Sequence, residues 1–138
     1  MRGRLWGIMS ALSGFHHVKL PVADVDRSRD WYQRVLGLEL SMEFVEDGVL
    51  MGVALRSPDG SVQLAARHDP ARAAALAGFD PIALGVPTRI GLEEWLRGFD
   101  GLGEQHGGIV TGHVGWLIVG LHDPDGIEVR LYTLEEHE

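Results

Sequence analysis

Apolar and polar residues alternate near the start of the chain and then give way to a helical spacing. From Val18 to Val22 every second residue is apolar, which is typical of a strand with one buried face. Asp24 is suited to cap a following helix, and Gly37 to end it. The residues of one helical stripe are Ser28, Trp31, Tyr32, Val35 and Leu36. The pattern predicts a strand followed by an amphipathic helix.

Further strands are predicted before the middle of the chain. Apolar runs at 38–45 and 49–55 are separated by a Glu-Asp-Gly turn. A Ser-Pro-Asp-Gly turn at 57–60 leads into a strand at about 61–65. Together with the first strand and helix, these elements form a β-α-β-β-β unit.

The same order of elements begins again after an alanine-rich stretch. Ile82, Leu84 and Val86 repeat the spacing of the first strand, and Thr88 is suited to cap a second helix. The stripe of this helix consists of Leu92, Trp95, Leu96 and Phe99, and glycines at 98, 101 and 103 end it. The restart predicts a second copy of the unit.

Strands at about 109–112, 115–121 and 127–133 complete the second copy. An Asp-Pro-Asp-Gly turn at 123–126 precedes the last of them and echoes the first Pro-Asp-Gly turn. Two units that each leave one sheet face uncovered must pack against each other or against a partner chain. We therefore predict an α+β fold of tandem β-α-β-β-β modules.

The predicted boundaries divide the chain into an extension and one domain. The extension covers residues 1–13, with Met9 as an alternative start. Module one covers 14–66, a connector 67–80 and module two 81–134.

Composition excludes several classes of partner. The chain has 138 residues and a formal net charge of −8, which repels polyanions, so we expect neither nucleic acid nor membrane as a partner. It contains no cysteine, which excludes disulfides and cysteine-bound zinc and is compatible with the cytoplasm, where we place the protein. Any metal would need His, carboxylate or amide ligands.

Several short motifs, taken in order, resemble those of a known family. They are His17-Val18-x-Leu20-x-Val22 with Asp24, Trp31-Tyr32, Leu36-Gly37-Leu38, Gly115-Trp116 and Asp123-Pro124-Asp125-Gly126. The set resembles the glyoxalase / bleomycin-resistance / extradiol-dioxygenase superfamily, also called vicinal oxygen chelate proteins. This resemblance implies eight strands in one curved mixed sheet around a cup, helices outside, commonly in a homodimer.

The resemblance also implies a divalent metal in the cup, held by the first and last strands of each module. Carried over, its ligand positions are His17, Gln63, Pro81 and Arg130. Proline offers no side-chain ligand, and a guanidinium repels a cation, so we expect no cofactor. The alternative is zinc, nickel, manganese or iron at a displaced site of His17, Gln63 and Glu128.

Alternation places a set of mostly small and polar residues on the concave side: His17, Lys19, Ser61, Gln63, Ala65, Ala83, Gly85, Glu128, Arg130 and Tyr132, to which we add Trp116 and Ile118. From these we predict a ligand site of His17, Lys19, Gln63, Trp116, Glu128, Arg130 and Tyr132, suited to a small aromatic or carboxylated molecule. An ordinary structural ion pair between Arg130 and Glu128 stays open.

Three functions remain in view. The first is binding of a small organic ligand in a cup with a degenerate metal site. The second is an enzyme, either a metal-dependent lyase, isomerase or dioxygenase, or a metal-free catalyst with His17 as general base and Arg130 stabilising an oxyanion. The third is a structural or regulatory dimer with a vestigial cup. Nucleotide-binding fingerprints are absent from the sequence.

Overall fold

The computed structural model describes residues 10–138. The prediction of Met9 as a start, and most of the predicted extension, fall on residues 1–9, outside the described part. The first module contains β1 (Val18–Val22), α1 (Val25–Leu36), β2 (Glu39–Glu46), β3 (Val49–Arg56) and β4 (Gln63–His68). The remaining elements are α2 (Pro70–Leu76), β5 (Ile82–Val86), α3 (Arg89–Leu102), β6 (Ile109–Thr111), β7 (Trp116–Ile118) and β8 (Val129–Thr133).

The eight strands form two mixed sheets of the same topology. Their orders are β1-β4-β3-β2 and β5-β8-β7-β6, so β8 of the second sheet takes the place of β4 in the first. In each sheet the first strand pairs with the last in parallel, and the other pairings are antiparallel. The predicted α+β repeat of β-α-β-β-β modules is confirmed.

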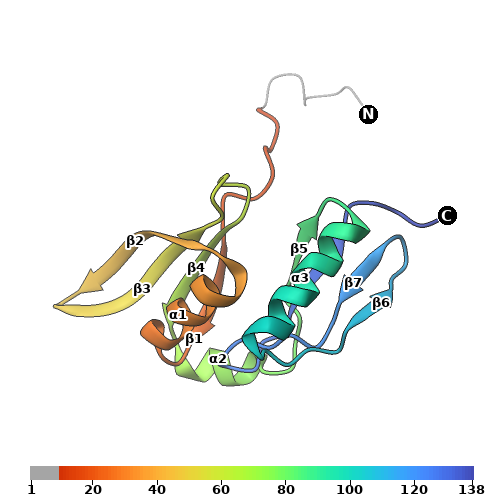
Figure 1. Cartoon of the computed structure of the whole chain (residues 1–138). Helices are drawn as coiled ribbons and strands as arrows, with labels where there is room; N and C mark the ends of the chain where they lie inside the picture. Colours follow the sequence, from red (N-terminus) through yellow and green to blue (C-terminus); the bar gives the residue numbers. More distant parts are fainter. Residues whose placement is uncertain (1–9) are drawn as a thin grey trace.

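Within the single chain, the eight strands expected around the cup divide into two four-stranded sheets that are not closed. Two four-stranded sheets stand side by side, with α1 and α3 in front of them in the view of Figure 1. Among residues 10–138, β1 and β5 each pair with a single neighbouring strand, and Pro21 removes a backbone donor from β1. Residue alternation defines the faces of a strand but not which strands pair, which is why the sequence did not reveal the break.

Both long helices begin and end at the predicted caps. The Asp24 carboxylate accepts a hydrogen bond from the Arg27 N–H, and the Thr88 hydroxyl accepts one from the Gly91 N–H. Gly37 and Gly103 end the helices with φ of 69° and 73°, a left-handed conformation that favours glycine. None of the helices among the described residues is long and apolar enough to cross a bilayer.

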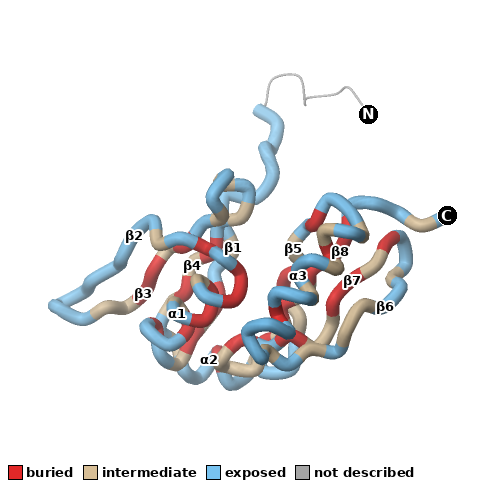
Figure 2. Tube along the Cα trace, in the orientation of Figure 1, coloured by how far each residue is buried: buried red, intermediate tan, exposed pale blue. Residues whose placement is uncertain are grey.

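One hydrophobic core joins the two modules. It combines residues of α1, such as Val35, with residues of β5 and α3, such as Val86 and Phe99. Figure 2 shows buried segments in the strands and helices of both modules, whereas β2 is exposed over almost its whole length. The helices cover one face of each sheet; we call the opposite face of each sheet its open face.

The second Pro-Asp-Gly turn fastens module two to the first helix. The Tyr32 hydroxyl donates a hydrogen bond of 2.8 Å to the Asp123 carboxylate in a buried position. The Asp125 carboxylate accepts from the Ala23 N–H and the Ser28 hydroxyl at the start of α1. This contact holds both open faces in a fixed relation to the shared core.

Candidate functional site

The open face of the first sheet carries rows of side chains set by strand register. One row runs from Lys19 through Ala65 and Ala54 to Met42. The neighbouring row is Pro21, Arg67, Gly52 and Phe44. Residues that pair directly across strands lie on the same face of the sheet. The long side chains of Lys19, Arg67 and Phe44 therefore surround the short side chains of the alanines and the glycine between them.

The charge on this face is positive although the chain is acidic overall. Lys19 is exposed, and within residues 10–138 its amine forms no ion pair. Arg67 makes two hydrogen bonds to the Glu46 carboxylate, at 2.6 and 3.1 Å. The Arg67 hydrogen bond holds the pKa of Glu46 below its usual value, so the pair stays ionised and neutral overall. Of these two neighbouring cations, Lys19 is therefore the one without a carboxylate partner among residues 10–138.

A small cavity, which we call the basic cavity, lies on this face. It has a volume of about 240 Å³ and is lined by His17, Lys19, Phe44, Ala65, Ala66 and Arg67. The Phe44 ring packs against Gly52: a Cβ there would meet the ring carbon Cδ2 at 3.5 Å and the Ala66 carbonyl oxygen at 2.8 Å. The absence of a side chain at Gly52 therefore positions the ring beside the cavity.

Sequence reasoning missed Phe44 and Arg67. A signal for Phe44 was available, because it alternates with Met42 along an apolar run. Arg67 lies on the same face as Ala65, but the predicted strand ended at residue 65, whereas β4 continues to His68. An error of a few residues at a strand end thus removed a cationic side chain from the predicted site.

A second cavity, which we call the intermodule cavity, opens between β1, β4 and β5. It has a volume of about 500 Å³, and its lining includes His17, Gln63, Pro81 and Ala83. Three of the four positions that the family resemblance assigns to metal ligands therefore meet here. The fourth, Arg130, does not line it.

Arg130 is held by two carboxylates, one from its own module and one from the connector. Its Nε lies 2.7 Å from a Glu128 oxygen, and a terminal nitrogen lies 3.1 Å from an Asp80 oxygen. Glu128 also accepts from the Gly120 N–H. Burial alone would raise the pKa of Glu128, but the Arg130 and Gly120 hydrogen bonds outweigh it and lower the value. The structural ion pair that the sequence left open is the arrangement that forms.

Tyr132 is also engaged within its own sheet. Its ring lies on the open face beside Leu117, and its hydroxyl accepts from the Val114 N–H at 3.4 Å. That hydroxyl occupies the space in which a Cβ at Gly112 would lie, so a glycine is needed there. The polar groups of the second open face are thus satisfied by neighbouring residues.

Trp116 lies on the opposite face from the one predicted. β7 has three residues, and its Leu117 pairs with Tyr132 on the open face, which turns Trp116 and Ile118 toward α3. The Trp116 ring lies under the Arg89 guanidinium, 5.2 Å from its carbon, and Ile118 is fully buried. The prediction that Trp116 lies in the concave ligand site was wrong, because the alternation of β7 is shifted by one residue.

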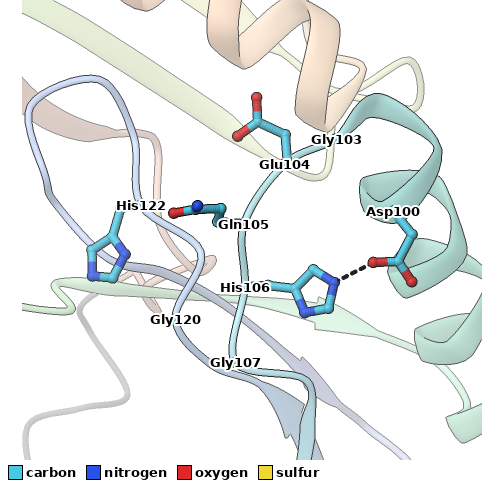
Figure 3. A pocket seen from close by; sticks show the side chains of 8 residues that line it. All are labelled: Asp100, Gly103, Glu104, Gln105, His106, Gly107, Gly120 and His122. Atoms are coloured by element: carbon cyan, nitrogen blue, oxygen red, sulfur yellow. Dashed lines mark hydrogen bonds and ion pairs between the residues drawn. The ribbon is translucent and has the colours of Figure 1, made fainter.

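A third cavity, the polar recess, lies near the end of α3 and outside both open faces. Figure 3 shows its lining: Asp100, Gly103, Glu104, Gln105, His106, Gly107, Gly120 and His122. The His106 Nδ1 accepts from the Gly108 N–H, so its Nε2 donates to Asp100 at 2.6 Å. Both ring nitrogens are used, which leaves His106 no free lone pair to act as a base. Among residues 10–138 no three His, Asp or Glu side chains are grouped to hold a metal ion.

The repeat topology and the two open faces define a class of protein. The family model of the Glyoxalase/Bleomycin resistance protein/Dioxygenase superfamily matches residues 14–131, and the chain belongs to this superfamily. No curated protein sequence matches the chain.

Several solved structures share this fold. A lactoylglutathione lyase from Agrobacterium tumefaciens is 17% identical, with a TM-score of 0.72 over 91% of this chain and 96% of that one. TnmS3, an antibiotic binding protein from Streptomyces sp. CB03234, is 16% identical, with a TM-score of 0.72 over 91% and 98%. The fosfomycin resistance protein FosX from Listeria monocytogenes is 15% identical, with a TM-score of 0.65 over 89% and 94%. A mutant of FosX has been solved with Mn(II) and 1S,2S-dihydroxypropylphosphonic acid.

Proposed function

We propose that the chain binds a small organic ligand on the open face of its first module. The observation that carries this proposal is the contrast between the polar groups of the two faces. On the first face, the Lys19 amine and the Gln63 amide form no hydrogen bond within residues 10–138. On the second, Arg130, Glu128 and Tyr132 are satisfied internally. Donors without a protein partner are the groups that remain for a ligand.

We further propose that the metal site of the superfamily is degenerate in this chain. Pro81 has no side-chain donor atom, and Gln63 offers only a neutral amide. Arg130 brings a permanent positive charge to the fourth position. The displaced alternative needs Glu128, which accepts from Arg130 and Gly120 and does not line the cavity of His17 and Gln63. These residues do not fit a divalent cation, and we propose no reaction step that uses one.

A catalytic pair of His17 and Arg130 has less support than ligand binding. His17 lines both the basic cavity and the intermodule cavity, whereas Arg130 lines neither and is held by Glu128 and Asp80. The described antibiotic binding of TnmS3 supports a binding role for the same fold without requiring a reaction. Small-molecule binding is therefore our proposal for the open face of the first module.

We also propose a homodimer in the cytoplasm. β2 is an edge strand, and the β2–β3 hairpin exposes Met42, Val45 and Val49, each more than half accessible. An exposed apolar edge favours pairing with another chain. Light scattering in solution should give twice the 15.1 kDa of one chain, and a single-chain mass would exclude the dimer. The cytoplasmic location rests on the cysteine-free composition.

Thermal unfolding in the presence of candidate ligands tests the binding proposal. We would screen organic acids, neutral aromatics and glycopeptide-like compounds against the wild-type protein, with nickel, zinc, manganese, iron and cobalt salts in parallel. The expected result is a rise in Tm with an organic compound, because binding to the native state alone stabilises it. The control is Arg97→Gln, on the exposed part of α3, which should respond as the wild type does. If no organic compound raises the Tm, the binding proposal is overturned, and a rise in Tm with a metal salt would contradict the proposed loss of the metal site.

A further inference from the structure

We infer that the basic cavity binds a single-ring aromatic monocarboxylate, with Lys19 facing the carboxylate and Phe44 facing the ring. This inference rests on the proposed function and assigns its ligand class. It places the ligand on residues of one module, away from Arg130, and it includes Phe44 and Arg67, which lie together only because of strand register.

The size of the cavity limits the ligand. Its volume is about 240 Å³. An apolar protein cavity of about 150 Å³ accommodates benzene. The basic cavity therefore has room for one ring and one carboxylate, but a second fused ring would extend beyond its walls.

The walls of the cavity favour a flat apolar body. Ala65 and Ala66 line it, and their short side chains leave room above the sheet. Phe44 is 38% exposed, so part of its ring is available for contact. Aromatic rings pair favourably in offset or edge-to-face arrangements, which gives an aromatic ligand an advantage over an aliphatic acid of equal volume.

The charges around the cavity favour one carboxylate. Arg67 is already bonded to Glu46 through two nitrogens, so its charge is compensated. Lys19 is the cation of this cavity without a carboxylate partner among residues 10–138, and His17 adds a second donor. A charge-assisted hydrogen bond from an ammonium favours an anion and disfavours an amine at the same place.

Lys19 is the single lysine of the chain, which makes the inference directly testable. Reductive methylation with ¹³C-formaldehyde labels its amine and that of the N-terminus. In the labelled full-length protein, titration with benzoate should shift the Lys19 dimethylamine resonance in a saturable way, while benzylamine at equal concentrations should not. Binding of 2-naphthoate should be no tighter than that of benzoate. A Lys19 resonance that benzoate leaves unmoved would overturn the inference.

Variants separate the two contacts of the ligand. Lys19→Gln should weaken benzoate binding by about tenfold or more, since charge-assisted bonds contribute more than neutral ones. Phe44→Leu keeps an apolar side chain at an exposed position and should weaken benzoate more than cyclohexanecarboxylate. Arg97→Gln removes one positive charge elsewhere and should bind benzoate as the wild type does. Equal binding by Lys19→Gln and the wild type would reject this assignment.

The outcome is distinguishable from failure of the proposed function. If other organic compounds raise the Tm while benzoate neither binds nor shifts the Lys19 resonance, the cup binds a ligand and the ligand class inferred here is wrong. If no organic compound raises the Tm and benzoate leaves Lys19 unmoved, both proposals fail.

Discussion

The two modules have the same strand order, but the polar side chains of their open faces are bonded differently. In module one, Lys19 and Gln63 stand on the open face without partners among residues 10–138. In module two, Arg130 is paired with Glu128 and Asp80. Polar side chains that bind each other add to stability, and those that remain unpaired are available to a ligand. The comparison supports our proposal that the open face of the first module binds the ligand and that the second module has a structural role.

The two Pro-Asp-Gly turns also differ in the partners of their aspartates. In the first, Asp59 accepts from the backbone and hydroxyl of Ser61 and from the Ser57 hydroxyl, so the turn is bonded to itself. In the second, Asp123 and Asp125 reach α1 of the other module. A motif repeated in sequence can therefore close a local turn in one copy and join the modules in the other.

The largest effect is expected from breaking the second turn. Asp123→Ala removes the acceptor of the buried Tyr32 hydroxyl and of the Asp125 and Ile127 N–H groups. We expect a loss of about 3 kcal/mol in the free energy of unfolding, because buried donors are left unsatisfied. Urea unfolding followed by circular dichroism measures it.

The matched change in the first turn is Ser57→Ala. It removes the acceptor of the Val62 N–H and the donor to Asp59 at a less buried site, where water can replace both. We expect a loss of about 1 kcal/mol or less. Equal losses in the two variants would contradict the assignment of the intermodule contact to the second turn alone.

A smaller effect separates the two open faces. Arg130→Met removes the partner of Glu128, whose side chain is 12% exposed, and we expect a loss of about 1 kcal/mol, limited by solvent screening. Lys19→Gln should change the free energy of unfolding by less than about 0.5 kcal/mol, since no contact is lost. Urea unfolding of both proteins tests the pair, and a larger loss in Lys19→Gln would reverse the roles that we assign to the modules.

Much of the fold could be predicted because it depends on local patterns. Asp24 and Thr88 cap the helices as expected, and Gly37 and Gly103 end them. Strand ends were less accurate, as in β4, which runs to His68. The separation into two sheets could not be predicted, because strand pairing depends on contacts between distant residues.

The candidate site could be predicted only where the strand phase was unambiguous. Strict alternation through the five residues of β1 places Lys19 on the expected face. In the three-residue β7, a shift of one position moves Trp116 to the helix side. The pairing of Arg130 was foreseen as one of two alternatives, but its Asp80 partner lies in the connector, where no pattern indicates a contact.

The smallest expected effect concerns the pKa values of two turn carboxylates, Asp59 and Asp123. Hydrogen bonds from Ser61 and Ser57 lower the pKa of Asp59 from 3.8 to about 2. Burial raises the pKa of Asp123 above 3.8, although bonds from Tyr32 and two backbone N–H groups oppose it. A carboxyl whose pKa is lower in the native than in the unfolded state stabilises the native state at pH values above its unfolded pKa. A carboxyl whose pKa is raised in the native state makes the protein less stable as the pH rises.

These signs predict opposite pH dependences for two isosteric variants. The contribution of Asp59 is complete above pH 3.8 and is lost as the pH falls toward 2, so Asp59→Asn should flatten this acid limb. Because the pKa of Asp123 is raised in the native state, its contribution to stability is largest when the carboxyl is protonated and falls as the pH rises from 3.8 through the raised pKa. Asp123→Asn should therefore remove this decline in the free energy of unfolding above pH 3.8. Urea midpoints from about pH 2 to 7 measure both slopes. If the two variants gave parallel curves of urea midpoint against pH, the two turn carboxylates would have similar environments. That result would contradict the distinction between a first turn bonded to itself and a buried second turn that joins the modules.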